Sequence, residues 1–362
     1  MKNNILALIL IGISFTSGFT ITQRIVDDIF MVMIVGYDYV DENLITGTAV
    51  SPDYKADRTI ENIALTDTAS LIYENRDKLE AKSPRPLLSG KLEAALFNRE
   101  LAEHGIIDYI DNLQRDPSIG ARVFLAVFDG STQKILSQSF KDMPTGVYFS
   151  DLIEQSSKFD NLPVTNLHTF IYQYFAAGMD PLLPLLEETE EKNTKVNIKG
   201  LALFKDDKMV DEIEKKDFLF FRSLYEHFDN GTMFIKFDDE ERAFLSTIKA
   251  SKKVTVKDEK SNFNPKVSIT LKMNGMIREY SGEKINRRII NNYERQINEK
   301  IEKKTNEMIK HFQELGIDPI GIGDYVSNYS RNWDEDKWKD IYPTLDITVN
   351  VEFTILEHGI IK

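Results

Sequence analysis

The stretch LEAALFNRELAEHGIIDYIDNLQRDPSIGARVFLAVF, residues 92–128, contains the pattern that decides the fold. Its first apolar run, 92–97, predicts a strand. Its last run, 122–128, is almost continuously apolar, as in a strand buried on both faces. The residues between the two runs are typical of helices. A strand, a helical segment and a second strand in this order favour a mixed α/β layer.

Two short helices are predicted within this stretch. Asn98 can cap the first, because its side chain can accept a hydrogen bond from the backbone of the first turn, and Gly105 is a typical helix end. The second helix spans residues 107–113. It ends before Asp116-Pro117, since proline disfavours helix in the residue that precedes it.

The N-terminal flank predicts a hairpin and a helix. Two runs rich in apolar and β-branched residues, 29–40 and 44–50, are separated by a polar turn and predict the hairpin. The helix has Thr66 or Asp67 as its cap and one apolar stripe through residues 69–79.

The C-terminal flank predicts helices over 149–158 and 167–177, followed by a dense charge run at 187–193 that marks a domain boundary. The run could bind a cation. A solvated linker is favoured, because the ligand spacing of a calcium loop is missing. Further along, the predicted elements are a hairpin at 196–213, a helix at 217–227 and a strand at 232–237.

The last hundred residues predict a hairpin and a long helix. Residues 267–273 alternate with period two, Asn274-Gly275 predicts a hairpin turn, and 276–280 would begin the return strand. In the helix, apolar residues from Ile285 to Leu315 recur at about every fourth position. This helix could pair in a coiled coil, but a helix lying across the two predicted strands is favoured.

Gly316 is expected to end this helix, Asp334 to cap a short one, and residues 345–356 to form the final strand. At about 150 residues per domain, 362 residues suggest two to three domains. We expect a mixed α/β (α+β) fold in which each domain packs a sheet with helices and the last places the long helix across an antiparallel sheet. The expected limits are 1–18 for a signal peptide or anchor, 19–190 for an N-terminal α/β domain, 196–258 for a small middle domain and 262–362 for the C-terminal domain.

Composition narrows the function classes. Hydrophobic residues make up 42% and charged residues 28%, as in an ordinary folded protein, so disorder and a multi-span membrane protein are not indicated. Asp and Glu number 58 against 45 Lys and Arg, and the formal charge of −13 argues against nucleic acid as a partner. The chain has no cysteine, which excludes disulfides, thiolate zinc sites and thiol nucleophiles.

The N-terminus predicts export. Lys2 precedes an uncharged apolar run at 5–15 and then small and hydroxyl residues, which is the order of a secretory signal peptide. Counted on to residue 21, the run approaches the length of an uncleaved membrane anchor, and a buried N-terminal strand or helix is the remaining alternative. No later segment is long and apolar enough to span a bilayer, so we expect the body of the protein outside the cytoplasm.

Catalytic motifs are not found in the sequence. The five histidines are scattered over separate predicted elements without the i, i+4 spacing of a helical zinc site. No Gly-x-Ser-x-Gly elbow occurs, and the one Gly-x-Gly, at 321–323, follows a helix and is interpreted as a turn. We therefore expect no catalytic residue, no cofactor and no metal site.

Residues 96–117 closely resemble the central motif of the Ger(x)C family, the C subunits of spore nutrient germinant receptors. Three further segments resemble family motifs in the same order. Residues 200–210 look like the hairpin of the second domain. Residues 318–324, and 338–343 with the strand that ends at 357–359, look like the C-terminal signature. The resemblance spans essentially the whole chain.

The resemblance implies a three-domain α/β lipoprotein on the outer face of the inner spore membrane. Such a protein works with two integral-membrane subunits in germinant sensing and is not an enzyme. Glu100, Arg115 and Arg122 match charged positions that recur in the family. Their role is unassigned, and ion pairs or caps between packed elements are favoured for them.

One residue departs from the family pattern. Family members carry a lipidated cysteine near the N-terminus, followed by Trp and Asp, and Phe19 stands at that position here. Because Phe has no sulfur, thioether lipidation at residue 19 is impossible. Three alternatives follow. The apolar N-terminus stays uncleaved as an anchor, the partner subunits hold the protein, or the chain is a divergent paralogue with impaired function.

Two other functions compete with a receptor subunit. Export, length and several α/β domains also suit an extracytoplasmic solute-binding protein, which would have a cleft with affinity for a small molecule. An exported hydrolase is the third possibility, and the missing motifs count against it.

Overall fold

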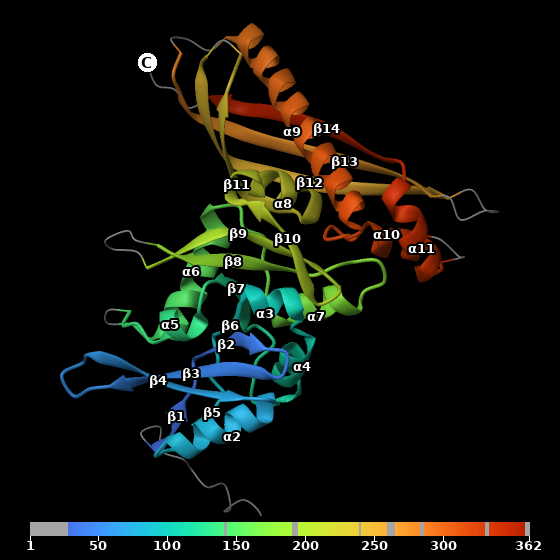
Figure 1. The fold of residues 1–362 in the computed structure, drawn as a ribbon. Helices are drawn as coiled ribbons and strands as arrows, with labels where there is room; N and C mark the ends of the chain where they lie inside the picture. The colour runs from blue at the N-terminus through green and yellow to red at the C-terminus, as the bar shows by residue number, and fades with distance from the viewer. Residues whose placement is uncertain are drawn as a thin grey trace, which may run out of the picture.

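The structure is a computed structural model that describes residues 28–140, 143–189, 195–238, 240–258, 265–282, 286–329 and 333–358. It forms two halves, an N-terminal half (residues 28–217) built on an eight-stranded sheet and a C-terminal half (residues 218–358) built on a four-stranded sheet (Figure 1). The predicted signal peptide or anchor at 1–18, and residues Phe19, Ile285 and Gly359, lie outside the described residues.

The eight-stranded sheet has a parallel centre and antiparallel flanks, in the order β10-β9-β8-β7-β6-β2-β3-β4. The central strands are β2 (Ile34–Asp41), β6 (Ala94–Asn98), β7 (Phe124–Asp129) and β8 (Leu182–Glu188). The flanks are β3 (Leu44–Tyr54) with β4 (Ile60–Ala69), and β9 (Val196–Lys205) with β10 (Lys208–Glu214). A separate parallel pair joins β1 (Phe30–Met31) to β5 (Leu87–Leu88).

Helices cover both faces of this sheet, so its central strands are buried on both sides. One face packs against α2 (Ile72–Lys82), α3 (Arg99–His104), α4 (Ile107–Arg115) and α7 (Leu167–Phe175). The other face packs against α5 (Thr132–Leu136) and α6 (Thr145–Phe159).

The C-terminal half follows a 3-10 turn, η2 (Lys215–Asp217), and begins with α8 (Phe218–Tyr225). Its sheet has the order β11-β12-β13-β14, with β14 parallel to β13 and the other pairs antiparallel. The strands are β11 (Phe228–Lys236), β12 (Arg242–Asp258), β13 (Pro265–Tyr280) and β14 (Ile347–His358). The helices are α9 (Arg287–Leu315), α10 (Ile322–Tyr329) and α11 (Glu335–Ile341), and η3 (Tyr342–Thr344) is a further 3-10 turn.

The long helix α9 lies across one face of the four-stranded sheet and packs against β14 (Figure 1). Its apolar stripe is fully buried at Tyr293, Ile297 and Ile301, which accounts for a stable helix of 29 residues. Asn286 caps its start, and Gly316 ends it with φ +66°, a left-handed conformation that glycine adopts without steric cost.

One apolar core runs through both halves. The cluster that includes Phe128 and Phe149 of the N-terminal half continues through Phe221 of α8 to Leu245 and Phe312 of the C-terminal half. Burial of apolar area is the main stabilising term in folding, so a shared core couples the stability of the two halves.

Most of the predicted elements are confirmed, including the mixed α+β class, the first hairpin, the two short helices in 98–115 and the long helix across the last sheet. The last sheet is mixed rather than purely antiparallel, because β14 joins it in parallel.

The hairpin predicted at Asn274-Gly275 is wrong. β13 runs straight through both residues and has a neighbour on each side, β12 and β14. The register shifts beside Gly275 in both pairings, and a Cβ there would lie 3.0 Å from Ile248 and 3.2 Å from Phe353. Glycine therefore serves a bulge with close packing here, and two partner strands override the local turn signal.

The helix cap predicted at Thr66 or Asp67 is also wrong, because these residues belong to β4 and the helix begins at Ile72. The hydroxyl oxygens of Thr66 and Thr48 lie 3.0 Å apart across β3 and β4, a cross-strand pair typical of threonine in a sheet.

The acidic run at 187–193 does not separate two sheets. β8 and β9, on either side of it, pair with each other, and β9 and β10 complete the N-terminal sheet. The strands placed by sequence in a middle domain at 196–258 are thus shared between the two sheets. The limits of the three domains stay a prediction.

The free edge of β14 generates a stability prediction. Asn298 of α9 accepts a hydrogen bond of 2.7 Å from the Phe353 N–H on this edge. Asn298→Ala leaves that N–H without its acceptor, and we expect the free energy of unfolding to fall by about 1–3 kcal/mol in a denaturant titration. Asn306→Ala is the control, since the Asn306 side chain donates to the carbonyl of Glu302 in the same helix and bonds no strand in the part of the chain that the structure describes. Equal effects of the two changes would contradict this role of Asn298.

Candidate functional site

The three charged motif positions are not brought together. Glu100 is exposed on the first turn of α3, Arg115 is exposed at the end of α4, and Arg122 is exposed before β7. Arg115 bonds Asp111 one turn earlier, at 2.6 Å. No hydrogen bond or ion pair among the described residues joins any two of the three, so they do not form one site. Their individual roles stay a prediction.

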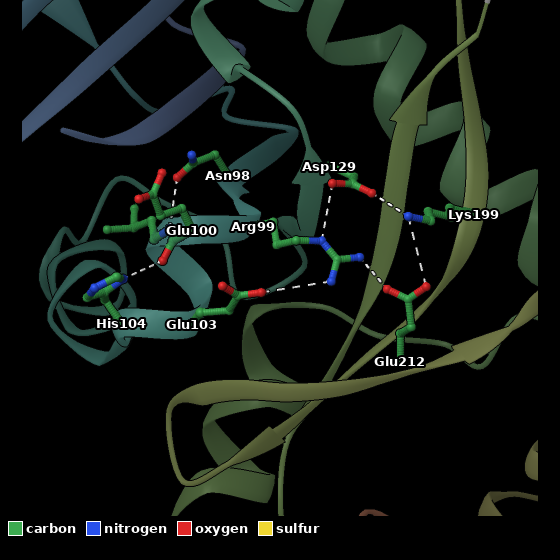
Figure 2. A network of polar contacts seen from close by, with 9 residues as sticks. Asn98, Arg99, Glu100, Glu103, His104, Asp129, Lys199 and Glu212 are labelled. Atoms are coloured by element: carbon green, nitrogen blue, oxygen red, sulfur yellow. Dashed lines mark hydrogen bonds and ion pairs between the residues drawn. The ribbon is translucent and has the colours of Figure 1, made fainter.

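The polar centre of this region is the neighbouring residue, Arg99 (Figure 2). Its guanidinium lies between two carboxylates from different strands, bonding Asp129 at the end of β7 at 3.2 Å and Glu212 of β10. Lys199 of β9 contacts the same two carboxylates. Glu103 completes the network at 3.9 Å from Arg99. Two cations and two shared carboxylates therefore tie the parallel centre of the sheet to its antiparallel flank.

Mutual charge stabilises this network against the cost of partial burial. Burial by itself would lower the pKa of Arg99, but the hydrogen bond to Glu212 and the charge of Asp129 outweigh it, and the pKa is raised. Burial would raise the pKa of the Asp129 carboxyl, while Lys199 and Arg99 lower it overall. Arg99 and Asp129 therefore both stay charged near neutral pH.

The local sequence places Arg99 by means of Asn98. The Asn98 side chain accepts an N–H from Leu101, which caps α3, and an N–H from Tyr39 of β2, both at 3.0 Å. One amide oxygen thus fixes the start of the helix and its position over the sheet. Arg99 follows directly and projects from the carboxyl end of β6.

The first and second motif segments also meet at Gly105. Its φ of +124° favours glycine, and a Cβ would lie 2.6 Å from the Asp207 carboxylate. Asp207, in the turn between β9 and β10, accepts the N–H of Ile107 at 3.1 Å, and its carbonyl accepts the N–H of Ile106. The end of α3 and the start of α4 are therefore held by that turn.

Asp180 joins the second segment to the third. Its carboxylate accepts the N–H of Asp206 at 3.0 Å and the N–H of Asp318 at 2.7 Å, and its own N–H donates to the Asp318 carbonyl at 3.0 Å. Asp206 belongs to the N-terminal half and Asp318 follows α9 in the C-terminal half. One side chain therefore clasps the two halves.

Close glycine packing joins the third and fourth segments beside this clasp. Gly178 has φ +65°, and a Cβ on it would lie 2.8 Å from both the Gly323 Cα and the Trp338 Nε1. Trp338 is buried. All four motif segments thus meet in one region, which we call the motif junction. Its residues are Arg99, Gly105, Gly178, Asp180, Lys199, Asp207, Glu212, Asp318, Gly323 and Trp338.

Asp318 is the most strongly perturbed acid of the junction. It is 3% exposed, and burial raises the pKa of its carboxyl to about 7 although the N–H groups of Gly323 and Ile322 oppose the shift. Burial lowers the pKa of nearby Lys252 to about 8, and the charge of Asp318 opposes that change. One carboxyl oxygen of Asp318 and the hydroxyl of Tyr342 find no hydrogen-bond partner among the residues that the structure describes.

A pocket of about 270 Å³ lies at the junction and is lined from both halves. Carboxylates, two lysines and aromatic rings share its wall, including Asp180, Lys205, Asp318, Trp338 and Tyr342. Its volume suits only a small molecule.

No group of three or more metal-ligating side chains gathers among the described residues. Searching the same residues, we find no helix with the length and apolar character needed to cross a membrane.

Sequence reasoning missed the junction residues although the signal lay beside the motifs. Arg99 immediately precedes Glu100, and Lys199 and Glu212 flank the second segment, residues 200–210. The opposite charges of Arg99 and Glu212 could have suggested a pair. Nothing in the sequence indicated that β10 lies across from α3.

Comparison with known proteins identifies the class to which this fold and junction belong. Residues 22–188 match the family described as "Spore germination protein N-terminal domain", and residues 199–359 match "Spore germination B3/ GerAC like, C-terminal". The chain belongs to the Ger(x)C family of spore germination proteins.

Two particular relatives extend this result. The chain is 28% identical to the spore germination protein GerQC of Bacillus cereus over 359 residues, which covers 98% of this chain and 97% of that protein. The crystal structure of the GerBC protein shares the fold, with a TM-score of 0.58 at 15% identity, over 89% of this chain and 96% of that chain. The resemblance found in the sequence is therefore confirmed over nearly the whole length.

Asp318 generates a pH prediction. Because its pKa is raised on folding, the folded state binds the proton more tightly, and its contribution to stability is lost as pH rises from about 4 to 7. Asp318→Asn keeps an acceptor for the Gly323 N–H but carries no charge. The quantity to compare is the melting temperature of the variant minus that of the parent. We expect this difference to be larger at pH 8 than at pH 5, by at least about 3 °C.

Asp151→Asn on the exposed side of α6 is the control. Its melting temperature should change with pH in the same way as that of the parent. If the melting temperature of Asp318→Asn also followed that of the parent from pH 5 to pH 8, the result would contradict a buried, titrating carboxyl at residue 318.

Proposed function

We propose that this chain is the extracytoplasmic, non-enzymatic C subunit of a spore nutrient germinant receptor and is needed for the germination response. Its membership of the Ger(x)C family supports the receptor role, as does a relative of nearly equal length named as a spore germination protein. The partners we propose are two integral-membrane receptor subunits and the membrane surface, on the outer face of the inner spore membrane.

The observation that carries the proposal is the motif junction. The segments that carry the family resemblance meet there. Gly105 of the first segment lies against Asp207 of the second, and Asp206 of the second and Asp318 of the third donate N–H groups to the same carboxylate, that of Asp180. The polar side chains of the junction bond groups of the same chain, within the N-terminal half at Arg99 and Asp207 and between the halves at Asp180, so they hold the chain in a fixed arrangement. A fixed scaffold suits a protein that works by association with partners.

The anchoring of the chain follows from Phe19 in this proposal. With no cysteine sulfur, the chain is held by an uncleaved apolar N-terminus or by its partner subunits. The formal charge of −13 disfavours nucleic acid as a partner.

A solute-binding protein remains the second candidate because of the pocket between the halves. About 270 Å³ with carboxylates, lysines and aromatic rings would suit a small polar solute. Calorimetric titration of the protein with amino acids and sugars tests it, since heats of saturable binding are expected for a solute-binding protein and no heat for a scaffold.

Germination assays test the receptor role. Deleting the gene should abolish the response of spores to at least one nutrient. Spores that carry Arg99→Ala should show a reduced response to that nutrient, because Asp129 and Glu212 lose one of the two cations that lie between them and keep only Lys199. The measurement is the loss of optical density of a spore suspension after nutrient addition, with immunoblots to report the amount of protein.

Lys158→Ala is the matched control, since it removes one exposed ion pair within α6 and should leave the response unchanged. Normal germination of the deletion strain in every nutrient tested would overturn the proposed function.

A further inference from the structure

The face of the C-terminal sheet that α9 leaves open is basic. In the antiparallel pairing of β12 with β13, Lys249 lies opposite Asn274, Lys253 opposite Thr270 and Lys257 opposite Lys266. Opposed residues point to the same side of a sheet, and the alternate residues of both strands belong to the core under α9. We call the open side the basic face and define it by five exposed lysines, Lys249, Lys253, Lys257, Lys266 and Lys272.

These lysines are largely uncompensated. Glu352 of β14 pairs with Lys272 at 3.3 Å, and the other four lysines form no ion pair with any residue that the structure describes. This cluster of positive charge contrasts with the formal charge of −13 for the whole chain. An anionic partner would therefore be drawn to this face and repelled by most of the remaining surface.

Lys257 and Lys266 give a second reason for an anionic partner. They lie directly opposite each other across β12 and β13, and like charges in that position destabilise a sheet. An anion placed over the pair would relieve the repulsion.

The shape of the face distinguishes a membrane from a protein. The five lysines lie within residues 249–257 of β12 and 266–272 of β13, so the basic face extends for about 26 Å at roughly 3.3 Å per residue. Between its lysines lie short hydroxyl and amide side chains such as Ser251 and Thr270. Protein interfaces are depleted in lysine and depend on aromatic and arginine anchors, whereas an anionic bilayer attracts lysines without shape complementarity.

Two further features suit lipid. A shallow hollow of about 360 Å³ presents Lys249, Ser251 and Lys272, which can donate to a headgroup phosphate, and also Glu352, the ion-pair partner of Lys272. Phe234 and Phe244 lie opposite each other on β11 and β12, away from the core, and are 63% and 39% exposed. Glu279 lies opposite Phe244 on the other side of β12, and exposed aromatic rings are typical of contacts at a membrane interface.

We propose that the basic face docks on an anionic phospholipid bilayer. This inference rests on the membrane location proposed above and adds the surface that meets the membrane. It concerns a different part of the chain from the motif junction, and the vesicle experiment requires no receptor partner, so its failure can be distinguished from failure of the receptor role.

Vesicle sedimentation with the full chain tests the proposal. The parent should bind vesicles of phosphatidylcholine with about 30 mol% phosphatidylglycerol more tightly than vesicles of phosphatidylcholine alone, and 1 M salt should abolish this preference by screening. The variant with Lys253→Gln, Lys257→Gln and Lys266→Gln should lose the preference by roughly 100-fold, or by at least ~10-fold. The ratio between the two vesicle types removes any contribution of the apolar N-terminus, which all variants share.

Two matched variants complete the test. Lys300→Gln, Lys303→Gln and Lys310→Gln on α9, which covers the opposite side of the sheet, make the same charge change and should keep the preference. Replacing Lys253, Lys257 and Lys266 by Arg should also keep it. A parent without preference for the anionic vesicles would overturn the proposal and leave an acidic protein as the partner to be sought. Equal losses in the two glutamine variants would overturn it as well.

Discussion

The carboxylate of Asp180 is the interaction on which the arrangement of the molecule depends. It accepts N–H groups from Asp206 in the N-terminal half and Asp318 in the C-terminal half, so two backbone segments 112 positions apart in the sequence (318 − 206) share one acceptor. A half-buried carboxylate that accepts backbone N–H groups is costly to replace, because its loss leaves those donors unpaired. The glycine contact of Gly178 with Gly323 and Trp338 lies beside it and requires the same close approach of the halves.

The junction shows which contacts the motif segments of the family make in the folded chain. Arg99 and Lys199 hold the flank of the sheet to its centre, the flank presents the turn with Asp206 and Asp207, and that turn meets Asp180 and Gly105. Contacts thus run in sequence from the first motif segment to the last. The positive charge that we propose for association lies on a separate surface, the basic face on the open side of β12 and β13.

Local signals in the sequence were sufficient for much of the fold. Asn98 and Gly105 placed a helix correctly because capping and left-handed ends are decided by adjacent residues. Asn274-Gly275 misled because the two strands that flank β13 come from distant parts of the chain, and their pairing outweighs a local turn preference. The junction could not be predicted for the same reason. Glu100, Arg115 and Arg122 were visible as charged motif positions, but only the topology shows that Arg99 lies between Asp129 and Glu212.

Differential scanning calorimetry of the full chain tests most directly whether the junction makes one body of the two halves. A shared apolar core and the Asp180 clasp predict a single transition whose calorimetric and van't Hoff enthalpies agree. Two separable transitions, one for each sheet, would contradict the account.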